Sequence, residues 1–283
     1  MSPLPRTFAL TAAAMLAFAA NSVLCRLALQ GRGIDPASFG SLRLLAGALT
    51  LVLVLRWRAR TPARAAQAGD WFAAAMLFAY VAFFSFAYLS LSAGTGALIL
   101  FGAVQLTMLA AGWRGGEAFG VMGGLGFVLA LAGLAWLVAP GVSAPAPLGA
   151  AAMALAGVAW GVYSLRGRGV ADPLAATAGN FLRAAPLALG LSLLLAAQAH
   201  ADAHGVLLAI ASGALSSGIG YVIWYAALPG LSALSAATVQ LSVPLLAAVG
   251  GVLFLAEAIS LRLALAGLAI LGGIALVLLR RAR

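Results

Sequence analysis

Apolar residues fill most of this 283-residue chain in long runs, and polar residues gather at a few short breaks. No Asp, Glu, Lys or Arg occurs in three of these runs, at 71–113, 118–165 and 203–256. Each run is roughly twice the ~20 residues that a helix needs to cross a bilayer. Turn-forming residues interrupt each run near its middle, at 92–96, 140–147 and 229–230. The pattern therefore predicts pairs of membrane helices joined by tight turns.

The other segments hold one helix each, which predicts an all-α polytopic membrane protein. Charged residues make up only 8% of the chain, whereas a soluble domain carries about 25%. The first segment resembles a cleaved signal peptide, but its apolar run continues to Cys25 and we keep it as a helix. The ten predicted helices cover about 8–28, 37–55, 71–91, 93–113, 117–139, 147–165, 174–197, 205–227, 231–255 and 261–279.

The net charge of +10 comes from arginines that are unevenly placed. If the N-terminus is cytoplasmic, the outer side receives only Arg26, Arg32 and Arg262. The inner side receives Arg6, Arg56, Arg58, Arg60, Arg64, Arg114, Arg166, Arg168, Arg280, Arg281 and Arg283. This asymmetry follows the positive-inside rule and predicts that both termini are cytoplasmic. It also explains the basicity without a nucleic-acid partner, which we do not expect.

An internal repeat emerges when the chain is shifted by 140 residues against itself. Glu117 then meets Glu257, and Arg43 meets Arg183 just inside helices 2 and 7. The recurrence of rare charged residues is informative because the chain holds only six acids. We therefore predict two homologous five-helix halves, at 1–140 and 147–283.

Five helices per half is an odd number, so the second half enters the membrane from the opposite side. Such inverted repeats are typical of secondary transporters, which bind substrate near the midplane between the halves. This topology places Glu117 and Arg183 on the inner side and Glu257 and Arg43 on the outer side. We expect the two acids to pair with these arginines and brace the halves, because a charge near the bilayer needs a partner. The alternative is that both glutamates are solvated residues of the links between helices.

The chain resembles the EamA-type ten-helix transporters of the drug/metabolite transporter superfamily. The resemblance rests on Arg43 and Arg183, on Pro244, and on the link glutamates Glu117 and Glu257, each followed by a helix that carries glycine. The first half departs from the pattern at Val104, which stands where Pro244 maps. Within the superfamily the chain looks most like the YddG group of aromatic amino-acid exporters. That resemblance implies a multi-pass protein of the bacterial inner membrane that exports amino acids such as Phe, Trp, Tyr, Thr and Met.

Polar and aromatic side chains at membrane depth are the candidates for a substrate path. Aromatic rings stack with an apolar substrate ring and attract an ammonium group, while neutral polar groups bind the ends of a zwitterion. The alternative is that these residues only pack or form interfacial belts, as we expect of Trp57, Trp71 and Trp113 at helix ends. The candidate substrate-binding residues are Asn21, Tyr80, Phe84, Gln105, Trp160, Tyr163, Tyr221 and Trp224.

A gating or structural role is predicted for Pro244, Arg43, Arg183, Glu117 and Glu257. Pro244 removes a backbone hydrogen bond inside helix 9 and is expected to bend it, with pure packing as the alternative. No acid lies well inside a predicted span, so facilitated movement or exchange is favoured over proton coupling.

Other classes of function receive less support. A membrane enzyme has one cluster to offer, His200, Asp202 and His204, which is better interpreted as a solvated loop than as a metal site. A channel needs a ring of charges or carbonyls. A drug or other metabolite exporter of the same superfamily is the closest alternative. We expect no cofactor, no metal and no catalytic residue, with small-molecule substrate and lipid as partners, and either a monomer or a homodimer.

Overall fold

The computed structural model describes residues 3–58, 68–116, 120–141, 143–231 and 233–280. These residues are helical apart from short links and one isolated bridge between Ile34 and Ala201. The helices, in chain order, are α1 (Pro3–Gln30), α2 (Pro36–Trp57), α4 (Trp71–Ala87), α5 (Ala93–Arg114), α6 (Val121–Val138), α7 (Pro147–Arg166), α8 (Pro173–Leu194), η1 (Ala196–Gln198), α9 (Ala203–Ala211), η2 (Ser212–Ile219), α10 (Gly220–Ala227), η3 (Leu228–Gly230), α11 (Ala233–Val239), α12 (Ser242–Leu255) and α13 (Leu261–Arg280).

Aspartate fixes the start of several helices. Each of the four aspartates is an N-cap whose carboxylate accepts a hydrogen bond from a backbone amide of the first turn. Such a bond satisfies one of the amides that a helix start leaves free and places a negative charge at the positive end of the helix dipole. The capping residues are Asp35 for α2, Asp70 for α4, Asp172 for α8 and Asp202 for α9.

In the described part of the chain, eight helical segments are long and apolar enough to cross a membrane. They begin at Pro5, Pro36, Ala93, Val121, Pro147, Ala203, Ser235 and Leu261. α4 is equally apolar but shorter, at 17 residues. α8 is not among the eight because Asn180, Arg183 and Pro186 lower its mean hydropathy. The class predicted from the sequence, an all-α polytopic membrane protein, is confirmed.

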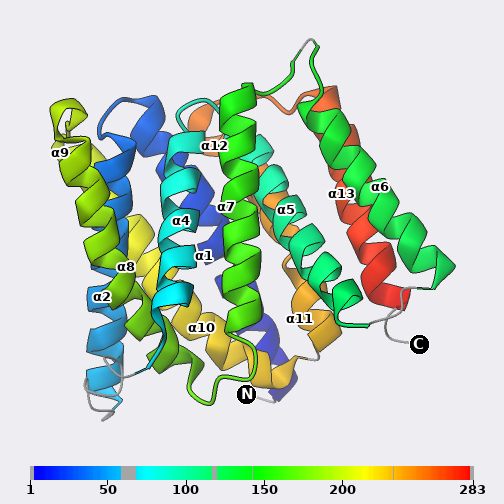
Figure 1. Cartoon of the computed structure of the whole chain (residues 1–283), viewed down its shortest axis with the longest axis horizontal. Helices are drawn as coiled ribbons and strands as arrows, with labels where there is room; N and C mark the ends of the chain where they lie inside the picture. The colour runs from blue at the N-terminus through cyan, green and yellow to red at the C-terminus, as the bar shows by residue number, and fades with distance from the viewer. Residues whose placement is uncertain (1–2, 59–67, 117–119, 142, 232, 281–283) are drawn as a thin grey trace.

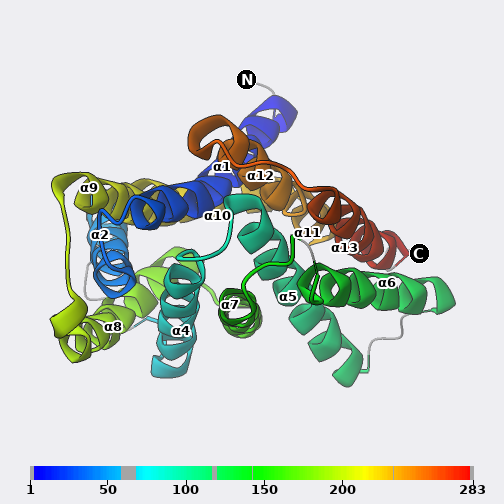
Figure 2. The same ribbon diagram turned by 90° about the horizontal axis from the view of Figure 1, so that it is seen from above.

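The helices stand roughly side by side in one bundle (Figure 1). α1 begins and α13 ends at the lower end of the bundle in Figure 1, whereas α7 begins at the upper end. Seen from above, α6 and α13 pack together at one edge, and α2, α8 and α9 lie at the opposite edge (Figure 2). α1, α4, α5, α7 and α10 lie between these edges.

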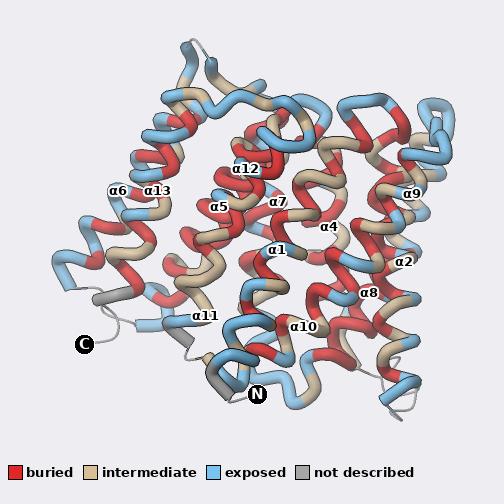
Figure 3. The backbone as a smooth tube through the Cα atoms, turned by 180° about the vertical axis from the view of Figure 1, so that it is seen from behind, coloured by how far each residue is buried: buried red, intermediate tan, exposed pale blue. Residues whose placement is uncertain are grey.

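Burial follows this arrangement. Buried residues are concentrated along the packed parts of the helices, and the links at 139–141, 143–148, 167–173 and 195–204 are mostly exposed (Figure 3). α5 is the most buried of the eight segments, with 72% of its span inside, and α6 the least, with 28%. Large apolar side chains such as Leu49, Leu253 and Phe254 remain exposed on the outside. Such a surface suits contact with lipid.

Two predicted helices are irregular. The helix predicted at 205–227 contains the π-helical segment η2 between α9 and α10. There a Cβ on Gly213 would clash with the carbonyl oxygen of Arg43, so glycine permits the close packing of η2 on α2. The helix predicted at 231–255 is divided at Gln240 and Leu241 into α11 and α12, and Pro244 lies in the first turn of α12. A first turn tolerates proline because its amides lack helical partners in any case.

Candidate functional site

A cavity of about 540 Å³ lies in the middle of the bundle, and we call it the central cavity. Its wall includes Phe18 of α1 and Phe101 of α5 from the first half of the chain, and residues of α7, α8 and α10 from the second. It reaches the lower end of the bundle in Figure 1, because Asp70 and the link 167–170 also line it. The central cavity therefore opens at the end where both α1 begins and α13 ends.

Aromatic rings form the inner wall of the central cavity. The Phe18 ring lies edge-on to three of them, with centroid distances of 6.3 Å to Trp160, 5.7 Å to Tyr221 and 6.0 Å to Trp224. The Trp160 ring also contacts the Tyr80 ring, at a centroid distance of 4.8 Å. Edge-on and offset contacts of this kind are favourable for aromatic pairs. The wall therefore offers ring faces and edges to an apolar guest.

A few neutral polar groups are set among these rings. Thr177, Asn180 and Gln240 line the central cavity together with Tyr163 and Tyr225. The hydroxyl groups of Thr177 and Tyr225 share a hydrogen bond of 2.8 Å. An apolar wall with few polar groups is typical of small-molecule sites.

A buried polar cluster lies beyond the aromatic wall. Arg43 of α2 donates from Nε to the Ser217 hydroxyl at 3.2 Å and from Nη2 to the Tyr80 hydroxyl at 2.9 Å. The side-chain Oδ1 of Asn21 accepts from the Ser212 hydroxyl at 2.8 Å and from the Ser217 hydroxyl at 3.4 Å. The cluster joins α1, α2 and α4 of the first half to η2 of the second.

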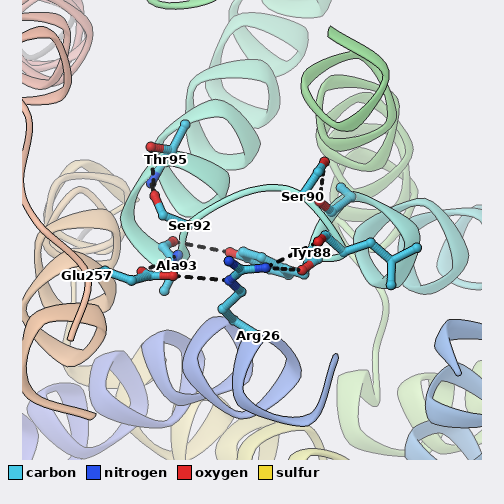
Figure 4. Close-up of polar contacts among 9 residues, drawn as sticks. Arg26, Tyr88, Ser90, Ser92, Ala93, Thr95 and Glu257 are labelled. Carbon is cyan, nitrogen blue, oxygen red and sulfur yellow. Dashed lines mark hydrogen bonds and ion pairs between the residues drawn. The ribbon is translucent and has the colours of Figure 1, made fainter. Parts of the chain in front are cut away.

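Glu257 lies in the link between α12 and α13, where its carboxylate makes contacts with α1 and with the start of α5 (Figure 4). Its carboxylate accepts from Arg26 Nε at 3.1 Å and from the Ala93 amide, at the start of α5, at 2.7 Å. Arg26 also donates to the carbonyl oxygens of Tyr88 and Leu89, which follow α4. One ion pair thus ties α1, the α4–α5 link and the α12–α13 link together.

The expected pairing of Glu257 with Arg43 is therefore wrong. Arg43 lies deeper in the bundle, where it contacts Tyr80 and Ser217, while Arg26 is one helical turn from the end of α1 and reaches the link. The alternative, that Glu257 is a solvated link residue, is also wrong, because its side chain is only 13% exposed. Glu117, the predicted partner of Arg183, lies outside the described residues. Arg183 itself donates to the carbonyl oxygens of Ala68 and Gly179.

A second ion pair lies at the open, lower end of the central cavity. Arg166 Nε lies 3.3 Å from Asp70 Oδ2, and both side chains are exposed to a third or more. Hydrogen bonding from the Ala73 amide, and then from the Arg166 side chain, holds the pKa of Asp70 below its ordinary value, although burial opposes this. Asp70 is therefore charged at neutral pH.

The predicted substrate-binding residues fall into three groups. Trp160, Tyr163, Tyr221 and Trp224 line the central cavity. Asn21 and Tyr80 belong to the polar cluster, and Phe84 packs against Arg43, whose guanidinium carbon lies 4.8 Å from the ring centroid. Gln105 is buried in α5 and is not part of the lining.

Sequence reasoning missed Phe18 and Arg26. The repeat contained a signal for Arg26, since Arg166 stands 140 positions later. Phe18 precedes Asn21 by about one turn on α1, and a search for rings next to polar groups within a helix would have found it.

The cluster of His200, Asp202 and His204 gives no metal site. The Asp202 carboxylate is committed to the Gly205 amide at 2.7 Å, at the start of α9. His200 is exposed, and its Nδ1 lies 3.1 Å from the carbonyl oxygen of Gln198. Among the described residues no group of three or more His, Cys, Asp or Glu side chains could hold a metal ion.

Comparisons with known proteins agree with this architecture. The family model of the EamA-like transporter family matches residues 147–279. Over 278 residues the chain is 56% identical to the uncharacterized protein PA1977 of Pseudomonas aeruginosa, an alignment that covers 98% of this chain and 96% of that protein. One crystal structure superposes with a TM-score of 0.65 at 23% identity, covering 94% of this chain and 98% of the other. At that identity the likeness shows the fold alone.

A bundle of apolar helices around a cavity lined from both halves of the chain is the architecture of a multi-pass membrane transporter. Residues 147–279 form a domain of the EamA-like transporter family, within the drug/metabolite transporter superfamily. Members of this family are transporters and not enzymes, so a small-molecule substrate and the lipid bilayer are its partners.

Proposed function

We propose that this protein exports aromatic and other apolar amino acids from the cytoplasm by alternating access through the central cavity. Phenylalanine and tryptophan are the expected substrates, with tyrosine, threonine and methionine as further ones. The single observation that carries the proposal is a cavity of about 540 Å³ lined by Phe18, Trp160, Tyr221 and Trp224, with a few neutral polar groups between the rings. This volume is within the range of roughly 300–1,000 Å³ that small-molecule sites occupy.

The proposed topology has ten crossings and two inverted halves. α4 and α8 run alongside the eight apolar segments within the bundle, which supports two further crossings. α1 begins at the lower end and α7 at the upper end (Figure 1), as inversion requires. The family match at 147–279 lies within the proposed second half. A cytoplasmic lower end puts both termini inside, in a bacterial inner membrane.

In this topology the central cavity faces the cytoplasm. Arg166 and Arg168 line its mouth, at the arginine-rich side. At the opposite end the ion pair of Glu257 with Arg26 ties α1 to the link between α12 and α13, and we assign the closure of that end to this pair. The structure is then the inward-open form, which takes substrate from the cytoplasm, and export requires the upper closure to open.

Counterflow in proteoliposomes tests the substrate class. Labelled phenylalanine, tryptophan, threonine and a lipophilic cation are each supplied outside vesicles loaded with the same unlabelled compound. Trapped accumulation of phenylalanine or tryptophan is expected. Accumulation of the cation alone would replace the proposal with a drug exporter of the same family.

A further inference from the structure

Arg43 is a buried cation whose charge no described residue balances. Arg43 is only 2% exposed, and its Nη1 has no hydrogen-bond partner among the described residues. Glu257 forms an ion pair with Arg26, and Asp70 forms one with Arg166. A buried charge without a partner is costly, and ionisable side chains inside a membrane protein mark functional sites.

The described carboxylates are all engaged elsewhere. The four aspartates cap helix starts at the ends of the bundle. Glu257 is held by Arg26 and the Ala93 amide. The groups that do surround Arg43 are neutral: two hydroxyls, and the rings of Tyr80 and Phe84 at 5.2 and 4.8 Å from its guanidinium carbon. Ring faces stabilise a cation, but they carry no negative charge. An anion bound beside Arg43 would therefore stabilise its guanidinium further.

Two rings in contact, Tyr80 and Trp160, lie between Arg43 and the central cavity. The Tyr80 hydroxyl accepts from Arg43, and the Tyr80 ring contacts Trp160, which lines the cavity. From the other side Ser217 bonds to Arg43, and Tyr221, one turn further along, also lines the cavity. A shift of the Tyr80–Trp160 contact would therefore join the cavity to the guanidinium.

We propose that Arg43 binds the carboxylate of the transported substrate, whose apolar side chain lies against the rings around Trp160. The site forms when Tyr80 and Trp160 separate, as the substrate moves from the inward-open cavity toward the polar cluster. The free Nη1 donates to one carboxylate oxygen, and the fork of a guanidinium suits two parallel bonds. The inference rests on the proposed function for the identity of the substrate, and it adds that a carboxylate is required.

A panel of phenylalanine analogues tests this requirement in the wild-type protein. Counterflow of labelled phenylalanine is competed by unlabelled phenylalanine, 3-phenylpropionate, phenethylamine and phenylalaninamide. The first two carry the carboxylate and are expected to compete. The last two lack it and are expected to be weaker by at least about tenfold, the factor for a lost charged hydrogen bond. Equal competition by all four overturns the inference.

Variants at two equivalent arginines locate the requirement. In Arg43→Gln, phenylalaninamide is expected to inhibit counterflow almost as well as phenylalanine does, so that the ratio of their inhibition constants approaches one. Arg43→Lys is expected to retain part of the preference for phenylalanine. Arg183→Gln is the matched control, because Arg183 holds the repeat position of Arg43 but donates to backbone carbonyls at the lower end. It is expected to keep the wild-type ratio. An unchanged ratio in Arg43→Gln contradicts the proposal, and if that variant does not fold, the wild-type panel and Arg43→Lys decide.

Binding without transport separates the two proposals. If phenylalanine shows no counterflow, the proposed function fails, and calorimetry with 3-phenylpropionate still tests the carboxylate site. Binding by the wild type and Arg183→Gln, but not by Arg43→Gln, supports the site. Absence of binding by the wild type overturns it.

Discussion

Loss of the Glu257 charge should open the upper end of the transporter. In Glu257→Gln the ion pair with Arg26, at 3.1 Å, is removed, and the hydrogen bond to the Ala93 amide at 2.7 Å becomes a neutral one. Hydrogen bonds to charged groups are worth about 1.5–3 kcal/mol. Because the two side chains are 16% and 13% exposed, solvent recovers part of that energy, and we expect a net loss of about 1–2 kcal/mol. The population open at the upper end should rise roughly 5- to 30-fold.

The chain contains its own reporter for this opening. Cys25 is the single cysteine, is fully buried and precedes Arg26 on α1. In spheroplasts, a membrane-impermeant maleimide should label Cys25 about 5- to 30-fold faster in Glu257→Gln than in the wild type. Arg26→Gln should act alike, and the double variant should add little because both changes remove the same pair. Asp70→Asn, at the lower end, is the control and should leave the rate unchanged. Wild-type labelling rates in both single variants would refute the closure role of the pair.

Two further predictions concern stability. Gly157→Ala places a Cβ 2.6 Å from both the Leu100 carbonyl oxygen and the Ala103 side chain of α5, so it should lower the free energy of unfolding by about 1–3 kcal/mol. Thermal unfolding in detergent measures this loss. Gly190→Ala is the control and should change the stability little, because nothing lies within 4 Å of its added Cβ. The second concerns Asp70, whose folded pKa lies below the ordinary value of 3.8. Its stabilising contribution is therefore complete above about pH 4 and is lost as pH falls through the folded pKa. The stability difference between the wild type and Asp70→Asn should stay constant from pH 8 to pH 5 and shrink only below pH 4, and a difference that shrinks near pH 6 would contradict this assignment.

Hydrophobic runs and turn residues were enough to predict the class of fold. The predicted spans agree closely with most helices, because long apolar runs have few alternatives to crossing a membrane as helices. The break at Gln240 lies four residues before Pro244, where the sequence predicts a bend. The π-helical segment at Ser212–Ile219 was not predictable, because it depends on tertiary packing, as at Gly213 against Arg43, and leaves no periodic signal in the sequence.

The candidate site was predictable in its residue types and less so in its contacts. Trp160 and Tyr221 were found because large polar rings are conspicuous inside apolar helices. The partner of Glu257 was assigned wrongly, because the repeat relates Glu257 to Glu117 and Arg43 to Arg183 without saying which arginine reaches the link. Only the packing of α1 against α12 and α5 brings Arg26 there.

The central claim is that the aromatic residues lining the central cavity bind the substrate. It is tested most directly by phenylalanine counterflow in proteoliposomes of the wild type, Trp160→Ala and Trp113→Ala, all checked as monodisperse. Trp160 contacts Phe18, Tyr80 and the cavity, whereas Trp113 is 70% exposed near the end of α5. The account predicts saturable counterflow that falls about tenfold or more in Trp160→Ala and is retained in Trp113→Ala. Equal counterflow by all three proteins would contradict it.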